Sequence, residues 1–224
     1  MEIKFKKIIG LAVLIGFIST IVYAQSAPEF LVSWRAINYV PADYQGKILP
    51  SNNSPVEVSF DLIDGNKIVN LSKKEINWYF NGRYFNSGIG LKTITFNSNG
   101  LDKNIRINIS DYNGRSLDKF LTVSNFKPEI VVDAKDINKK SAGKQYNFTA
   151  LPYFFNVSNL SQLKFQWKVN DQNLTGSVEN PESLSLDLKS ETILPGTNFN
   201  ILSSAQNIFN DLEFAAKKLN FTVK

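Results

Sequence analysis

The stretch Ile76-Asn77-Trp78-Tyr79-Phe80-Asn81-Gly82 places apolar side chains at every second position and ends in Asn-Gly. Alternation with a period of two predicts a β-strand with one buried face, and Asn-Gly is typical of a hairpin turn. Phe165-Gln166-Trp167-Lys168-Val169-Asn170-Asp171 repeats the pattern, with its tryptophan 89 residues after the first. The repeat predicts two copies of one small β-domain.

Further alternating runs flank both tryptophan strands. In the first half they cover 56–62, 93–96, 105–109 and 117–123, with turn signals at 64–66, 99–100 and 112–115. The second half repeats the order from residue 129, and Pro195-Gly196 takes the place of Asn99-Gly100. Residues 124–128 are the predicted linker. The pattern predicts an all-β chain of two antiparallel sandwiches, 27–124 and 127–224.

The segment 208–219 is the one with a helical pattern, because it carries apolar residues at helical spacing. The repeat favours a hairpin there instead, with its turn near Asn210-Asp211. The segment 34–50 precedes the first clear strand and includes Trp34, Tyr39 and Tyr44. We expect it to form a loop that covers one edge of the first domain or holds a ligand.

The chain begins with a pattern typical of export. Lys4, Lys6 and Lys7 precede an uncharged stretch, 8–23, and Ala24 stands before the expected cleavage site. This pattern predicts a helical signal peptide, 1–24, and a location outside the cytoplasm, secreted or in the cell envelope. The alternative is an uncleaved anchor at 8–24, although that stretch is shorter than the ~20 residues of a spanning helix.

Composition excludes several classes of function. The sequence has no Cys and no His, so disulfides, Ser-His-Asp and Cys-His catalysis and His-bearing zinc sites are ruled out. The net charge is +5, and it is +3 without residues 1–24, too weak and dispersed for nucleic-acid binding. Ser-Lys dyads and carboxylate pairs remain formally possible, but a small sandwich with short loops offers little of the cleft that catalysis needs. We therefore predict no enzyme activity, no catalytic residues and no cofactor. The abundance of Asn, Lys and Ile suggests an AT-rich bacterial genome.

Metal binding receives little support from the sequence. The stretches richest in oxygen ligands are 61–66 and 170–173, and neither matches the Asp-x-Asp-x-Asp-Gly pattern of a calcium loop. We interpret both as turns and predict no metal site. A calcium ion near Asp133 or Asp136 remains an alternative.

The tryptophan strand, the Asn-Gly after it, the Gly-bearing turn and the final hairpin resemble bacterial immunoglobulin-like (Ig-like) domains. They are also similar to polycystic-kidney-disease-type (PKD-like) repeats of exported surface proteins. The Trp-Asp-Phe-Gly-Asp-Gly signature of PKD domains is absent, and so is the Cys pair of antibody domains. The resemblance implies two tandem Ig-like sandwiches that serve as spacers, adhesion modules or protein-interaction modules.

Four tyrosines are the candidate binding residues. Tyr79 and Tyr84 lie in or beside the first tryptophan strand, with Tyr79 on the face opposite Trp78, and exposed aromatics can stack on sugars or anchor proteins. Tyr39 and Tyr44 belong to the long segment before the first clear strand. Trp78 and Trp167 are interpreted as core anchors, and ordinary strand packing remains the simpler role for the tyrosines.

The leading hypothesis is therefore an exported, non-enzymatic surface or envelope protein whose two Ig-like domains act as a structural or adhesive module. Its partners would be other surface proteins or glycans. One alternative is a carbohydrate-binding protein that uses exposed aromatics of the first domain. The other is an accessory subunit of an envelope machine, held by an uncleaved N-terminal helix.

Overall fold

A computed structural model of the chain describes residues 27–134, 145–187 and 196–223. The described chain is nearly all β, with fifteen strands and one short 3₁₀ helix, η1 (Leu160–Gln162). It falls into two compact units. One holds residues 27–31 with 61–69, and the other holds the remaining described residues. The expected signal peptide, 1–24, and Asp136 lie outside the described residues. Within the described ranges no helix is long and apolar enough to cross a membrane.

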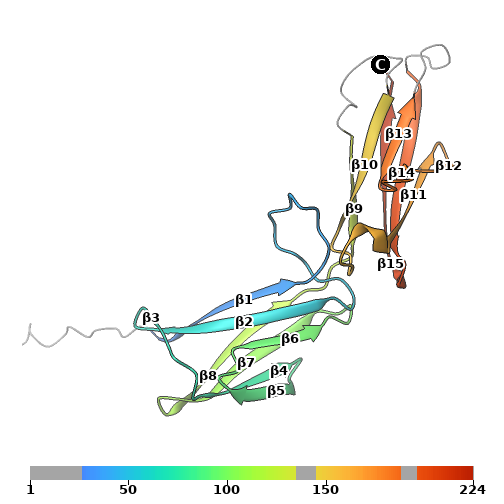
Figure 1. Cartoon of the computed structure of the whole chain (residues 1–224). Helices are drawn as coiled ribbons and strands as arrows, with labels where there is room; N and C mark the ends of the chain where they lie inside the picture. Colours follow the sequence, from blue (N-terminus) through green and yellow to red (C-terminus); the bar gives the residue numbers. More distant parts are fainter. Residues whose placement is uncertain (1–26, 135–144, 188–195, 224) are drawn as a thin grey trace, which may run out of the picture. The chain divides into compact units, whose positions relative to one another are not determined.

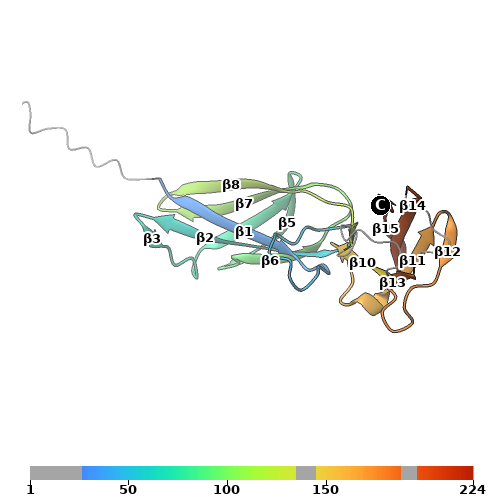
Figure 2. The ribbon, with the colours of Figure 1, turned by 90° about the horizontal axis from the view of Figure 1, so that it is seen from above.

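Strands β1 to β8 form two sheets (Figure 1). One contains β1 (Glu29–Ala36), β2 (Pro55–Asp64), β3 (Lys67–Ile68) and β6 (Thr93–Asn97), with β2 paired to the other three. The other runs in the order β5 (Arg83–Ile89), β4 (Glu75–Phe80), β7 (Lys103–Tyr112), β8 (Arg115–Val123). Figure 2 shows the same strands from above.

Strands β9 to β15 repeat this arrangement. One sheet runs in the order β13 (Ser183–Asp187), β10 (Gln145–Tyr153), β9 (Glu129–Asp133). The other runs β12 (Gln172–Leu174), β11 (Leu163–Val169), β14 (Asn198–Asn207), β15 (Asn210–Thr222). The fold is therefore all-β, in two Ig-like sandwiches of antiparallel sheets, as the sequence predicts. The division at residues 124–127 stays a prediction.

The two tryptophans occupy equivalent places. Trp78 on β4 is 0% exposed and Trp167 on β11 is 1% exposed. The indole Nε1 of Trp78 donates to the carbonyl of Leu91 at 2.9 Å, and that of Trp167 donates to the carbonyl of Pro181 at 3.1 Å. A buried indole N–H needs such a partner. Each sandwich therefore satisfies its tryptophan with a carbonyl of the connection that follows the tryptophan hairpin.

The asparagine three residues after each tryptophan is also equivalent. Asn81 and Asn170 both adopt left-handed backbone conformations, with φ of 48° and 47°. Asparagine tolerates this region because its short polar side chain forms local hydrogen bonds. The Asn81 Oδ1 accepts from the Asn104 amide at 3.0 Å, and the Asn170 Oδ1 accepts from the Asn200 amide at 2.9 Å. These side chains tie the end of each tryptophan strand to the neighbouring central strand.

Each core is formed by the apolar side chains that alternate with polar ones along the strands. In β2 the side chains of Val56, Val58, Phe60 and Leu62 are all at most 3% exposed. The ring of Phe60 meets Trp78 edge-on at 5.8 Å, so β2 and β4 pack face to face. The second core is built around Phe148, Ala150, Trp167, Ile201 and Ala205. Burial of each large apolar side chain contributes roughly 1.5–3 kcal/mol.

Two details differ from the sequence predictions. The segment before residue 56 contains a strand, β1, so Trp34 lies in a sheet and not in a long loop. Cross-strand polar pairs accompany this strand, including Arg35 Nε to Glu57 Oε1 at 3.0 Å.

The last hairpin turns at Ile208 and Phe209, two residues earlier than expected, because the Asn207 Oδ1 accepts from the Phe209 amide at 2.9 Å. The preference for strand over helix in this segment is confirmed by β15.

Candidate binding face

The outer face of the sheet β5-β4-β7-β8 carries a row of large side chains. Register pairs Tyr84 of β5 with Tyr79 of β4, Tyr79 with Arg106 of β7, and Arg106 with Phe120 of β8. Their neighbours Trp78 and Ile107 are fully buried, and side chains alternate across a strand. The four residues therefore point away from the core; we call them the aromatic row.

The aromatic row is exposed at both ends and packed in the middle. Tyr84 is 61% exposed and Phe120 is 69% exposed. The rings of Tyr79 and Tyr84 meet edge-on at 6.0 Å, and the Arg106 guanidinium carbon lies 4.1 Å from the Tyr79 ring centroid. The Tyr84 hydroxyl is hydrogen-bonded to Ser87 Oγ at 3.0 Å. These contacts hold Tyr79, Tyr84 and Arg106 in place before any ligand binds.

The positive charge of Arg106 in the aromatic row is compensated by Asp118 on the neighbouring strand. The Arg106 Nε lies 3.4 Å from Asp118 Oδ1, and both side chains are a little more than one third exposed. A surface ion pair of this kind contributes little stability, about 0–1 kcal/mol. Its effect here is to place an acid and a base side by side, so that the face carries little net charge.

A second row, of polar side chains, runs beside the aromatic row. Register aligns Ser87 of β5, Asn77 of β4, Asn108 of β7 and Asp118 of β8. The Asn77 Nδ2 donates to Ser110 Oγ at 2.7 Å, and the Asn108 Nδ2 donates to Asp118 Oδ1 at 3.1 Å. We call this set the polar row. Its amides are fixed by hydrogen bonds across three strands.

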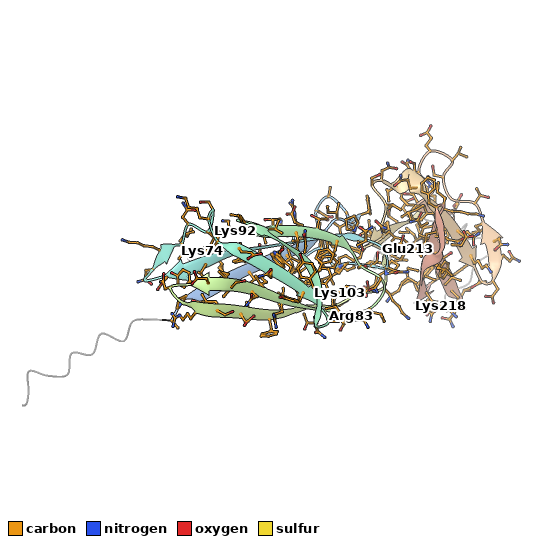
Figure 3. The ribbon with its side chains drawn as sticks, turned by 90° about the horizontal axis from the view of Figure 1, so that it is seen from below. Lys74, Arg83, Lys92, Lys103, Glu213 and Lys218 are labelled. Carbon is orange, nitrogen blue, oxygen red and sulfur yellow. The ribbon has the colours of Figure 1, made fainter. Side chains whose placement is uncertain are left out.

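The second sandwich shows that the fold does not need these aromatics. The positions equivalent to Tyr84, Tyr79, Arg106 and Phe120 hold Asn173, Lys168, Leu202 and Lys218, aligned by the same register about Trp167. Lys218 projects from β15 (Figure 3). The aromatic row is therefore a property of the first sandwich alone.

The other two candidate tyrosines lie elsewhere. The Tyr39 amide donates to the Phe155 carbonyl at 2.8 Å. The Tyr44 ring meets those of Tyr153 and Phe154 edge-on, at 5.5 Å and 5.8 Å. The structure thus brings Tyr79 and Tyr84 together and places Tyr39 and Tyr44 in a separate contact with residues 153–155.

Burial shifts the pKa of three groups in or near the contact between residues 39–44 and 153–155. The pKa of Tyr39 is raised by burial and, secondarily, by the negative charge of Glu182. The pKa of Tyr153 is raised by burial and then by Asp43 and Tyr44. Burial lowers the pKa of Lys47, whose Nζ lies 3.3 Å from the centroid of the Trp34 ring. All of these effects favour the uncharged form.

The described residues contain no cluster of three or more acidic or other ligating side chains suited to a metal ion. Asp61 and Asp64 lie on β2, Gly65 and Asn66 form the turn that follows, and Asn170 and Asp171 form the turn before β12. Both stretches thus have the turn structure that the sequence predicts.

The chain's relation to known proteins is distant. No model of a protein family matches it, and no curated protein does. Among solved structures it is similar to the fibronectin(III)-like modules of Clostridium thermocellum CbhA, at 14% identity over 87% of this chain and 94% of that one, with a TM-score of 0.30. It is also similar to the adhesin InvE of Yersinia pseudotuberculosis, at 14% identity over 86% and 58%, with a TM-score of 0.28.

A third similar structure contains three N-terminal domains of the highly immunogenic outer capsid protein of bacteriophage RB49. It is 7% identical over 88% of this chain and 59% of that one, with a TM-score of 0.45. These similar structures are thus fibronectin-like modules, capsid domains and an adhesin. The assignment of the fold rests on the sheets and registers themselves.

Proposed function

We propose that the chain is an exported, non-enzymatic protein of the bacterial surface or envelope. It acts there as a structural or adhesive interaction module, built of Ig-like domains at 27–124 and 127–224. The observation that carries this proposal is the aromatic row, which is exposed on a rigid sheet and absent from the equivalent face of the second sandwich. A sandwich supplies a stiff support, and the face it presents supplies the contact.

The geometry of this face favours a role in binding a partner over a role in catalysis. Exposed tyrosine and phenylalanine supply large contact area with little loss of conformational entropy, and such residues are enriched in binding sites. The face is open and its one ion pair is internal to it. An enclosed cleft with a strongly perturbed acid or base, the usual setting of catalysis, is a different arrangement.

Export can be tested in a bacterial host that expresses residues 1–224 with the native N-terminus. We expect the protein in the extracytoplasmic fractions, with Gln25 as its first residue by mass spectrometry. Met1 on a membrane-bound protein would instead support the envelope-machine subunit with an uncleaved anchor. Met1 on a cytoplasmic protein would overturn the proposal.

The interaction role can be tested with labelled protein comprising residues 25–224 and intact cells or purified envelopes. The double variant Tyr84→Ser/Phe120→Ser should lose saturable binding. The matched double variant Lys168→Ser/Lys218→Ser, at the equivalent positions of the second sandwich, should keep it. Equal binding by both variants would show that the aromatic row is not the contact surface.

A further inference from the structure

We infer that the aromatic row and the polar row together form a binding platform for a neutral, hydroxyl-rich glycan chain. This inference rests on the proposed role as an interaction module and names the ligand class of the same face. The two exposed rings, the compensated charge and the fixed amides each bear on this class of ligand.

The rings at the ends of the aromatic row provide stacking surfaces. Tyr84 and Phe120 lie on the two outer strands of the sheet, and each is more than 60% exposed. Neighbouring strands are about 4.8 Å apart, so three steps from β5 to β8 span roughly 14 Å. A platform of this width suits an extended chain that contacts one ring at each end. An isolated small molecule would reach only one of them.

The charges select against an acidic ligand. The guanidinium of Arg106 is already engaged by the Tyr79 ring at 4.1 Å and by Asp118 at 3.4 Å. A carboxylate or sulfate on the ligand would have to share the guanidinium with Asp118 and would lie near the negative charge of that side chain. A neutral sugar meets no such cost, because its hydroxyls can donate to Asp118 while the ion pair persists.

The polar row offers the directional contacts that sugars need. Amides and hydroxyls both donate and accept hydrogen bonds, as sugar hydroxyls do. Asn77 is half-buried and is held by a bond of 2.7 Å to Ser110, so its orientation is set in the free protein. Asn108 is only 8% exposed, and its role is to hold Asp118 in place through a bond of 3.1 Å. Preorganised polar groups beside exposed rings lower the entropic cost of binding.

The experiment is a glycan array followed by calorimetric titration, with protein comprising residues 25–224. Neutral polysaccharides are probed beside uronic-acid and sulfated ones. We expect binding to a neutral chain that is insensitive to added salt, because screening weakens only charge-driven contacts. Tyr84→Ala and Phe120→Ala should each weaken it about tenfold, the size of one lost aromatic contact.

Two controls keep the result interpretable. Tyr84→Phe retains the ring and should keep most of the affinity, while Lys168→Ala changes the equivalent face of the second sandwich and should change nothing. Circular dichroism verifies that each variant is folded. Absence of binding to any neutral glycan, or binding that ignores both ring deletions, would refute the inference.

The outcomes also separate this inference from the proposed function. If cells bind through the aromatic row while no glycan does, the partner is a protein, so the interaction role stands and the glycan assignment fails. A salt-sensitive preference for acidic glycans would also overturn the assignment of a neutral ligand. If the glycan binds but the protein stays in the cytoplasm, the platform stands and the proposed surface role fails.

Discussion

At the scale of single residues, each sandwich depends on one large anchor. Trp167 is 1% exposed within a core made of residues of the second sandwich, and its indole hydrogen is bound to a carbonyl. With no cysteine in the sequence, no disulfide can compensate for the loss of such an anchor. The anchors should therefore dominate the response of the fold to truncation.

Trp167→Ala is expected to lower the free energy of unfolding by ~3–5 kcal/mol, because it removes a buried ring and leaves a cavity. Chemical denaturation followed by circular dichroism measures the change. Trp167→Phe, which keeps a ring, should cost less. A loss below about 1 kcal/mol would contradict the burial of Trp167.

A buried carboxylate offers a second test. Glu213 is 3% exposed and lies on β15 (Figure 3). It accepts from Ser51 Oγ and the Asn156 amide at 2.8 Å each and from Asn207 Nδ2 at 2.6 Å. Three donors converge on two oxygens. Glu213→Gln replaces one acceptor with a donor and should cost about 1–3 kcal/mol of unfolding free energy.

Denaturant titration checks this cost, with Glu179→Gln as the control because Glu179 is exposed. The control should unfold as the unaltered protein does. If Glu213→Gln also did so, the three hydrogen bonds would have no energetic consequence.

Alkaline pH tests the tyrosines near residues 153–155. The raised pKa values of Tyr39 and Tyr153 mean that the unfolded chain loses these protons first, from about pH 10. Their stabilising contribution is complete below pH 10 and is lost as the pH rises through the folded-state values. The lowered pKa of Lys47 acts in the opposite direction between its folded value and the ordinary one.

Absorbance of the phenolate during a pH titration reports the tyrosines directly. Tyr39→Phe and Tyr153→Phe should each remove a late-titrating group. They should also flatten the fall in unfolding free energy above pH 10. Titration of every tyrosine at its ordinary pKa would contradict the assigned burial.

At the scale of elements, the β7–β8 hairpin determines the composition of the aromatic row. Its turn, Asn113-Gly114, has φ of 53° and 78°, the left-handed pair that tight hairpins require. A β-bulge between Ile109 and Tyr112 then shifts the register by one residue. A regular hairpin from the pair Tyr112–Arg115 would place Leu121 opposite Arg106. The bulge places Phe120 there instead.

Gly114→Ala tests the backbone conformation of the turn without a steric clash, because a Cβ at this residue would meet no atom within 4 Å. The cost therefore comes from the backbone alone, because alanine is strained at this positive φ, and should be roughly 1–2 kcal/mol. Urea denaturation measures it, with Arg115→Ala, at an exposed position of the same hairpin, as the control. An unchanged midpoint would mean that the turn relaxes without strain.

The bulge also marks the limit of prediction from sequence. Alternation and Asn-Gly turns predicted most strands, the two tryptophan positions and the outward direction of Tyr79. Phe120 was missed because a one-residue register shift moves every side chain to the other face, and local periodicity does not reveal such a shift. Arg106 was missed because its role depends on the strands beside it. Strand β1 was not predicted, because the exposed Leu31 interrupts its alternation of apolar and polar residues.

At the scale of the whole molecule, the predicted division near residue 125 makes each half a candidate folding unit. The core around Trp167 draws all of its buried members from 130–223. Segments 27–126 and 127–224, expressed separately, should therefore each give a strand-type circular dichroism spectrum and a cooperative thermal transition. The second segment should be less stable than in the whole chain, because Glu213 loses its Ser51 donor.

Calorimetry of both segments and of residues 25–224 makes the comparison. Two transitions in the longer protein, each matching one segment, would support the division into two domains. A segment that stays unfolded alone would show that the chain is a single cooperative unit.

The matched tryptophans also equip the protein with its own optical probes. One buried indole lies in each sandwich, and the third tryptophan, Trp34, is half-buried on β1. Variants that keep only Trp78 or only Trp167, with phenylalanine at the other two positions, would emit light from one sandwich at a time. The shift of that emission to longer wavelength as water reaches the ring would show which half opens first, without any attached dye.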